Sequence, residues 1–535
     1  MKYVIGVDFG TLSARALLVD IENKKTVSEE TSNYVHATLD RTLPSGKPLP
    51  IGTALQVPND YLTALSESVR GAISKAKIST EDVIGIGIDF TASTMLPIAA
   101  DGTPLCETEK YKDEPHAYVK LWKHHTATKE AEEITELAKK MGERFIYACG
   151  GKLSAELMLP KILETLRCAP EVYNDAYRFI EAADWISLVL TGKETGSPAF
   201  AGYKAGWTLE SGYPSNAFFT ALDERMDGFT DSKLGSVEPS IAAAAGTLNK
   251  RGADLLGLCE GTVVSLPMID AHASLAGLGV TGDGDMVMII GTSTCHILNS
   301  KEKTDVEGIF GYVKDGVFPG LYTYESGQSA VGDMLDWFVK NSIPSAYEKE
   351  ANEREIGIHS LLTEKAAKLG IGESGVIALD WWSGNRSILA DSSLTGMIHG
   401  VTMRTRPEEI YRALIEATAF GARVIFEQHE KFGIKIKGVT AAGGIANKNP
   451  LMMQIYADVL GKDIHIAKST QSGALGSAVY AASAAGAFSS IEAASKELAP
   501  VSEKVYHPNP ESVEKYNALY AKYRALHDYF AEHKI

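Results

Sequence analysis

Asp8, Gly10, Thr11 and Ser13 lie in a tight turn between two apolar runs at the start of the chain. The backbone N–H groups of such a turn can converge on phosphate oxygens, and the hydroxyls of Thr11 and Ser13 add donors. Gly10, like Gly6 before it, lets a ligand approach the backbone closely. A carboxylate beside phosphate needs a cation between them, so Asp8 is expected to bind Mg²⁺. A plain β-hairpin with a hydrogen-bonded aspartate explains this turn alone equally well.

A second turn of the same kind, GTST at residues 291–294, follows an apolar run in the other half of the chain. Two such turns from two halves of a protein can hold a triphosphate from both sides. Neither turn matches the P-loop pattern G-x-x-x-x-G-K-[ST] or the dinucleotide pattern G-x-G-x-x-G. The pair of turns favours a phosphate site over the plain hairpin.

Asp270 directly follows the apolar run VVSLPMI, where a strand is expected to end. A carboxylate in this position can accept the proton of a substrate hydroxyl, and burial would raise its pKa while nearby Mg²⁺ would lower it. The alternative is structural, since aspartate is a favoured N-cap and a helix is expected to begin near Ala271.

The elements that must position these residues alternate between strands and long helices, which indicates an α/β fold. Strands are predicted at 3–8, 15–20, 83–89, 286–291 and 438–442, and helices at 59–77, 156–167, 407–430 and 450–460. Each half reads strand, turn, strand, insertion, helix, strand. The matching order suggests two similar lobes around a cleft.

The glycine-rich segment 275–285 is the expected hinge, which divides the chain into a lobe at 1–278 and a lobe at 279–535. The stretch 471–491 consists mostly of Ala, Gly and Ser, so a buried, closely packed helix is expected there rather than a membrane span. By order of elements, the DFTAST segment at 89–94 corresponds to the TAAGG segment at 440–444, and the first turn to the second.

The composition is that of an ordinary globular protein, with 45% hydrophobic and 22% charged residues in 535. A net charge of −16 argues against nucleic-acid partners and anionic membranes. We expect no signal peptide, because Met1 leads directly into a strand, and we expect a cytoplasmic protein. The five cysteines are scattered, which disfavours disulfides and structural zinc: Cys106, Cys149, Cys168, Cys259 and Cys295.

DFGT with Ser13 and Arg15, the later GTST, the stretch TAAGGIANKNPLMMQIYADVLG and the segment WWSGNRSILADSSLTGMIHG together resemble the FGGY family of carbohydrate kinases. The resemblance extends over nearly the whole chain. It implies two duplicated lobes of the actin/hexokinase type (ribonuclease H-like), which close on ATP and a sugar. The resemblance also implies that the chain forms a homodimer. Gly384 and Arg386 match the glycine and arginine of the family's G-x-R pattern, but WWSGNR has a serine where that pattern usually has an aromatic residue or leucine before the glycine.

The resemblance also implies roles for individual residues. Asp270 would be the catalytic base and Asp8 the Mg²⁺-linked carboxylate, whereas His272 would pack rather than take part in chemistry. The expected ATP-binding residues are Thr11, Ser13 and Arg15 in the first half, Thr292 and Ser293 in the second turn, and Gly443, Gly444 and Asn447 beside the adenosine.

Several further segments, among them GIDFTASTMLPIAADGTPLC and FAGYKAGW, are similar to the bacterial members of the family that phosphorylate L-ribulose. This likeness implies that Ala92, Lys204, Asp270 and Glu325 contact the ketopentose. The expected reaction is the ATP-dependent conversion of L-ribulose to L-ribulose 5-phosphate. The alternatives are a kinase for D-ribulose, xylulose or a pentitol, an actin-like ATPase without a sugar, and an inactive sugar sensor.

His116, His124 and His125 cluster in sequence, but their spacing does not suit a tetrahedral metal site. A polar amphipathic helix is expected there instead.

Overall fold

In the computed structural model, the first apolar run forms β1 (Tyr3–Phe9), which pairs antiparallel with β2 and parallel with β5. The structure describes residues 1–469, 471–500 and 504–533. The sheet built on β1 has the order β3-β2-β1-β5-β10-β9, with β11 also paired to β5. Its other strands are β2 (Ser13–Asp20), β3 (Lys25–Asn33), β5 (Val83–Phe90), β9 (Ala244–Thr247), β10 (Val263–Ser265) and β11 (Met268–Ile269).

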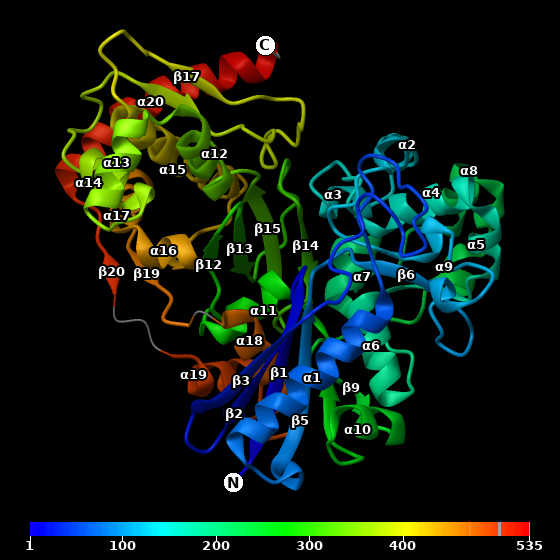
Figure 1. Cartoon of the computed structure of the whole chain (residues 1–535). Coiled ribbons are helices and arrows are strands. Elements are labelled where there is room, and N and C mark those ends of the chain that lie inside the picture. The colour runs from blue at the N-terminus through cyan, green and yellow to red at the C-terminus, as the bar shows by residue number, and fades with distance from the viewer. Residues whose placement is uncertain (470, 501–503, 534–535) are drawn as a thin grey trace. The chain divides into compact units, whose positions relative to one another are not determined.

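Two helices cover the opposite faces of this sheet, α1 (Pro58–Ala76) and α18 (Ser472–Ala484) (Figure 1). Because side chains alternate along a strand, Phe9 points toward α1 and packs edge-on against Tyr61 at 6.3 Å. Gly6 faces α18, and a Cβ there would lie 1.8 Å from the Ala474 carbonyl oxygen. The expectation that Gly6 admits a ligand is therefore wrong, because a helix occupies that space.

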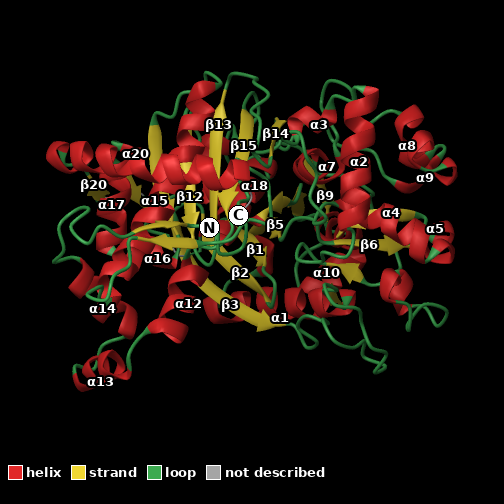
Figure 2. Ribbon diagram, turned by 90° about the horizontal axis from the view of Figure 1, so that it is seen from above, coloured by secondary structure: helices red, strands yellow, loops and turns green. Residues whose placement is uncertain are grey.

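A smaller sheet has the order β4-β7-β6-β8, and Figure 2 shows helices gathered around β6. Its strand β4 precedes α1, and its other three strands lie in a long insertion between β5 and β9. The strands are β4 (Leu55–Gln56), β6 (Met95–Ile98), β7 (Val119–Lys120) and β8 (Arg178–Glu181). The α-helices of the insertion are α2 (Thr128–Met141), α3 (Phe145–Ala148), α4 (Met158–Cys168), α5 (Pro170–Asp175), α6 (Ala182–Thr191), α7 (Pro198–Ala205), α8 (Asn216–Leu222) and α9 (Phe229–Lys233), and α10 (Lys250–Leu256) follows β9.

A second large sheet repeats the arrangement of the first, in the order β14-β15-β13-β12-β18-β19-β20. Here β12 pairs antiparallel with β13 and parallel with β18, as β1 does with β2 and β5. The strands are β12 (Asp285–Ile290), β13 (Thr294–Ser300), β14 (Gly311–Lys314), β15 (Tyr322–Gln328), β18 (Gly438–Ala442), β19 (Ile464–Ile466) and β20 (Val505–Tyr506). The predicted α/β fold with a repeated order of elements is confirmed.

The remaining elements complete the two halves. They are α11 (Asp270–Gly277), α12 (Gly332–Ser342), α13 (Ser345–Glu353), α14 (Ile358–Ala366), β16 (Ile377–Leu379), β17 (Met397–His399), α15 (Pro407–Lys431), α16 (Gly444–Lys448), α17 (Pro450–Leu460), α19 (Ile491–Leu498) and α20 (Pro510–His533). Pro58 and Pro407 begin α1 and α15, where a missing N–H costs nothing. Among the described residues, no helix has both the length and the apolar composition that a bilayer crossing requires.

The chain forms two packing units rather than two consecutive segments. The first unit contains Met1–Thr281, Tyr312–Thr323 and Gln471–Pro500, and the second contains residues 282–311, 324–469 and 504–533. The glycine- and alanine-rich helix α18 thus belongs to the first unit, since it packs on β1, β5 and α11. Its small residues permit this contact, which local sequence pattern does not reveal.

The histidine-containing segment 116–125 is not an amphipathic helix, so that expectation is wrong. It forms a 3₁₀ turn (Pro115–Ala117), the short strand β7 and a turn, and the next helix, α2, begins at Thr128. Strand pairing with β4 and β6 takes the place of helical hydrogen bonds.

Candidate active site

Three aspartates lie together where parallel strands of the first sheet end. Asp8 on β1 stands opposite Asp89 on β5, and Met268 of β11 stands on the other side of Asp89. Asp270 comes two residues after Met268 and is the first residue of α11. Because the carboxyl ends of parallel strands share one edge of a sheet, the topology gathers these carboxylates at one place.

Burial and mutual repulsion decide the protonation of the first two aspartates. Burial raises the pKa of Asp89 far above its usual range, and the charges of Asp8 and Asp270 raise it further. Burial also raises the pKa of Asp8, while a hydrogen bond from Asp89 and the charge of Arg15 lower it. Ser477 of α18 donates to Asp89 Oδ2 at 2.7 Å. Of the two carboxyl groups, Asp89 has the pKa that is raised further, so its acid form is favoured more strongly than that of Asp8.

Asp270 does not act as the helix cap that its position in the sequence allowed. The N-cap of α11 is Ile269, and Asp270 Oδ1 accepts the N–H of Ala271 at 2.6 Å. His272 is fully buried two residues later, and its ring packs on Tyr203 with centroids 4.5 Å apart. Since Tyr203 precedes Lys204 on α7, this contact brings the ends of α7 and α11 together.

Asp8 has the chemistry of a partial Mg²⁺ ligand. In the described parts of the chain, no three or more His, Cys, Asp or Glu side chains are arranged to enclose a metal by themselves. Mg²⁺ does not require such a cage, because it keeps several waters and takes one or two carboxylates together with phosphate. Asp8 therefore fits a Mg²⁺ ion that brings its own oxygen ligands.

The first glycine-hydroxyl turn is held by side chains from other elements. The N–H of Gly10 donates to the carbonyl of Ser13 at 3.0 Å and closes the turn. Tyr34 donates to the Gly10 carbonyl at 3.0 Å, and Gln56 Nε2 donates to the Thr11 carbonyl at 2.7 Å. Sequence reasoning missed Tyr34 and Gln56, because Tyr34 directly follows β3 and Gln56 lies on β4, both outside the motif.

The side chains of this turn also have partners. Trp122 Nε1 donates to Thr11 Oγ1 at 3.3 Å, and Trp122 is itself 40% exposed. Arg15, opposite Asp8 in the register of β1 and β2, donates to Gln471 Oε1 at 2.5 Å. The structure therefore brings Asp8, Thr11 and Arg15 together in the first unit.

The second glycine-hydroxyl turn has the same closure. The N–H of Gly291 donates to the carbonyl of Ser293 at 2.9 Å. The start of α12 caps this turn, because Val331 N–H donates to the Thr292 carbonyl at 2.8 Å and Gly332 N–H to the Gly291 carbonyl at 3.0 Å. The predicted equivalence of the two turns is thus seen in their backbone hydrogen bonds.

Gly443, Gly444 and Asn447 lie beside this second turn, within the second unit. Gly443 has a φ of 99°, and a Cβ there would lie 2.3 Å from the carbonyl oxygen of Ile290. Asn447 Nδ2 donates to the Gly443 carbonyl at 3.1 Å. Only glycine allows both this backbone conformation and this close approach.

The expected sugar residues fall in both units. Ala92 lies half-buried on a turn after β5, and Lys204 is only 4% exposed, at the end of α7 in the first unit. Glu325 lies on β15 in the second unit, also buried, and Arg386 Nη2 lies 3.8 Å from its Oε1. Burial of Lys204 and Glu325 contradicts the idea that they are ordinary surface charges. The ion pair also gives Arg386 of the WWSGNR segment a partner.

The buried histidines of the segment 116–125 surround a glutamate. Glu164 Oε2 accepts from Lys120 Nζ at 2.6 Å, and His116 and His124 lie 3.9 and 3.4 Å from it. Burial lowers the pKa of His116 to about 3 and that of His124 to about 4. The cluster is a buried ion-pair network rather than a metal site.

The chain matches one protein family along most of its length. Residues 3–277 match the N-terminal domain, and residues 286–485 the C-terminal domain, of the FGGY family of carbohydrate kinases. Ribulokinase from Halalkalibacterium halodurans is 47% identical over 536 residues, covering 99% of this chain and 95% of that protein. Ribulokinase from Staphylococcus aureus (strain Newman) is 40% identical over 529 residues, covering 99% and 96%.

Solved structures share the fold at lower identity. A ligand-bound xylulose kinase from Lactobacillus acidophilus has a TM-score of 0.81 at 20% identity, covering 99% of each chain. Xylulose kinase from Rhodospirillum rubrum has a TM-score of 0.80 at 21% identity, again covering 99% of each chain. The actin/hexokinase-type fold expected from the sequence is therefore confirmed.

Proposed function

We propose that this chain, which belongs to the FGGY family of carbohydrate kinases, transfers the terminal phosphoryl group of ATP to ribulose. Sugar kinases of this family use ATP as the phosphoryl donor. The observation that carries the choice of sugar is the 40–47% identity to ribulokinases over nearly the whole chain. The proposed substrate is L-ribulose and the product L-ribulose 5-phosphate, because the DFTAST and GYKAGW segments resemble those of the L-ribulose enzymes.

Asp270 is the general base in this proposal. Its place at the start of α11, beside the end of β11, puts a carboxylate at the strand edge where Asp8 and Asp89 also lie. Asp270 accepts the proton of the attacking sugar hydroxyl as the phosphoryl group is transferred. A positioned base of this kind contributes about 10²–10⁴-fold to the rate.

The sugar and phosphate contacts follow from the chemistry of the side chains. Lys204 donates to sugar oxygens, and Ala92 leaves space for the pentose chain. Thr11, Ser13 and Arg15 contact phosphate from the first unit. From the second unit, Thr292 and Ser293 contact phosphate, Gly443, Gly444 and Asn447 contact the adenosine, and Glu325 accepts from a sugar hydroxyl.

Asp8 is proposed to hold Mg²⁺ together with the ATP phosphates. When bound, the ion neutralises the charge on the phosphates and on the transferring group. Asp89, opposite Asp8 on β5, supports this role, because it opposes the burial-driven rise in the pKa of Asp8 and so favours the carboxylate form that binds a cation.

The test is ADP release measured with a panel of sugars: L-ribulose, D-ribulose, D-xylulose and L-xylulose, and the pentitols ribitol and arabinitol. L-ribulose should give the highest kcat/KM, and Asp270→Asn should lower kcat by about 10²–10⁴-fold. Asp254→Asn is the matched control, because Asp254 is an exposed carboxylate of the same unit. If no sugar stimulates ADP release, the kinase proposal fails, and if Asp270→Asn behaves like Asp254→Asn, the base is misassigned.

A further inference from the structure

The turn that carries Ala92 has an unusual backbone that needs support. Ser93, within this turn, has a φ of 55°, a left-handed conformation that a non-glycine residue adopts at a cost. Within the turn, the hydroxyls of Thr91 and Thr94 hydrogen-bond to each other at 2.9 Å. Two charged side chains from elsewhere in the first unit reach the same four residues.

Lys161 of α4 is the first of these side chains. It is fully buried, and its Nζ donates to the carbonyl of Ser93 at 2.7 Å and to the carbonyl of Leu121 at 2.6 Å. A lysine is rarely buried unless it is paired, so this placement indicates a specific demand for its donors. The Ser93 carbonyl that it holds belongs to the residue with the left-handed conformation.

Glu181, at the end of β8, is the second. Its Oε2 accepts the N–H of Thr94 at 2.9 Å, and Met95 after Thr94 pairs with Glu181 in the register of β6 and β8. The charges of Lys161 and Lys204 both act on Glu181. Burial raises the pKa of Glu181 to about 7 and lowers that of Lys161 to about 7.

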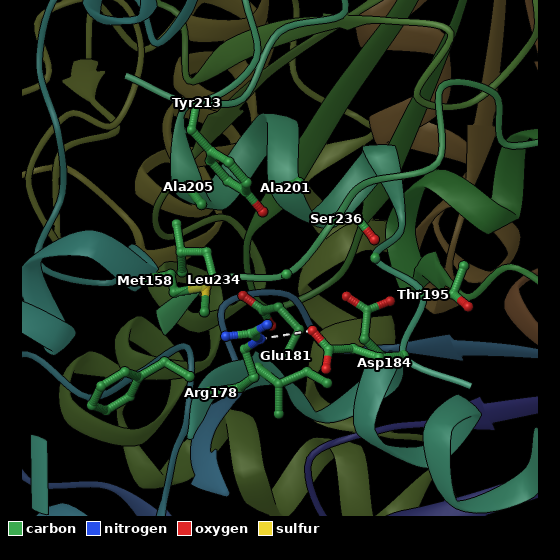
Figure 3. A pocket seen from close by; sticks show the side chains of 15 residues that line it. Met158, Arg178, Glu181, Asp184, Thr195, Ala201, Ala205, Tyr213, Leu234 and Ser236 are labelled. Atoms are coloured by element: carbon green, nitrogen blue, oxygen red, sulfur yellow. Dashed lines mark hydrogen bonds and ion pairs between the residues drawn. The ribbon is translucent and has the colours of Figure 1, made fainter. Parts of the chain in front are cut away.

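Glu181 also lines a cavity of about 40 Å³, which it shares with Asp184 and Tyr213 (Figure 3). Glu181 Oε1 is buried and has no hydrogen-bond partner among the described residues. Glutamine has the same shape as glutamate, so it is the substitution at position 181 that removes the charge and keeps the volume.

We propose that Lys161 and Glu181 are positioning residues of the sugar site, which fix the backbone of the Thr91–Thr94 turn and through it the affinity for the ketopentose. Lys161 holds the carbonyl on one side of the Ser93–Thr94 peptide, and Glu181 holds the N–H on the other. Both polar groups of this one peptide thus hydrogen-bond to charged side chains. This inference rests on the proposed sugar kinase activity.

The test compares Lys161→Met with Lys120→Met. Lys120 is the matched control, since it is a buried lysine of the same region whose Nζ donates to Glu164, to Thr165 and to the carbonyl of Lys161, and not to the described residues 91–94. Both substitutions remove a buried, hydrogen-bonded lysine, so both lower stability. Lys161→Met should raise KM for L-ribulose about tenfold, the loss expected for a hydrogen bond from a charged donor, and should change KM for ATP much less.

Two further measurements separate positioning from stability. In the double variant Lys161→Met with Glu181→Gln no buried charge is left unpaired, so its Tm should exceed that of Lys161→Met, while KM for L-ribulose stays raised. Hydrogen exchange of a peptide spanning residues 88–96 should be faster in Lys161→Met than in Lys120→Met. If KM and exchange are the same in these two variants, the proposal is wrong. The exchange measurement does not depend on activity, so it tests the positioning of the turn even if the wild type phosphorylates no sugar. A failure of this proposal can therefore be told apart from a failure of the proposed function.

Discussion

Gly476 offers a direct test of how α11, and with it Asp270, is placed. Gly476 of α18 faces Ala273 of α11, and a Cβ at position 476 would lie 1.9 Å from the Ala273 carbonyl oxygen. In the reverse direction, a Cβ on Gly277 of α11 would lie 2.1 Å from the Ser472 carbonyl oxygen. The two helices therefore touch backbone to backbone, with a glycine on each side.

The substitution Gly476→Ala forces these helices apart. Real Cβ atoms essentially never come closer than 3.0 Å to a neighbour, so the helices must separate by about 1 Å, the difference between 3.0 and 1.9 Å. The obstacle is backbone, which cannot rotate away as a side chain could. Overpacking of this kind costs about 1–3 kcal/mol, and a 1 Å displacement of a catalytic group can lower the rate about 10²-fold.

The measurements are urea unfolding and steady-state ADP release. Gly476→Ala should lower the free energy of unfolding by about 3 kcal/mol and kcat by about 10²-fold, because Asp270 lies one turn before Ala273. Gly357→Ala is the control, since a Cβ there would have its nearest neighbour 3.9 Å away, and the loss of glycine at this helix N-cap should cost only about 1 kcal/mol. An unfolding free energy and a kcat for Gly476→Ala that match Gly357→Ala would refute the helix contact.

Two other predictions concern the metal and the pH. Asp8→Asn should raise the Mg²⁺ concentration that gives half-maximal activity about tenfold, which is equivalent to about 1.4 kcal/mol of binding free energy. The measurement is a Mg²⁺ titration of ADP release. If the variant has the wild-type midpoint, Asp8 does not belong to the metal site. Burial lowers the pKa of His296 in the folded protein to about 4. Below the ordinary histidine pKa of 6.5, the unfolded chain therefore takes up a proton at this residue that the folded chain does not. Stability should thus fall as the pH drops from about 6.5 toward 4, by about 3 kcal/mol from this residue, and urea unfolding of His296→Gln should show a shallower fall.

Much of the fold could be predicted because local pattern determines local structure. Helix α17 begins at Pro450 and ends at Leu460, as predicted, since proline starts the helix and Gly461 follows it. Strand β18 spans Gly438–Ala442, also as predicted. The histidine-containing segment 116–125 was predicted wrongly, because its polar residues are buried around Glu164 and only the tertiary contacts account for them.

The candidate site divides in the same way. Asp8, Thr11 and Asp270 stand out in the sequence because their residue types follow apolar strands at turns, where function is common. Lys161 and Glu181 did not stand out, although each is a charged residue between apolar neighbours, which is a usable signal for a buried charge. Their role depends on which backbone groups they reach, and no spacing along the chain gives that.

The sequence by itself determined the order of elements, the two glycine-hydroxyl turns and the family, because these depend on neighbouring residues and on motifs. The tertiary structure decided what lies against what. It placed α18 in the first unit against Gly6, set Asp89 beside Asp8, and paired Arg386 with Glu325. The physical reason is that packing and burial join residues hundreds of positions apart, and both the pKa values and the close contacts of the site arise from those long-range encounters.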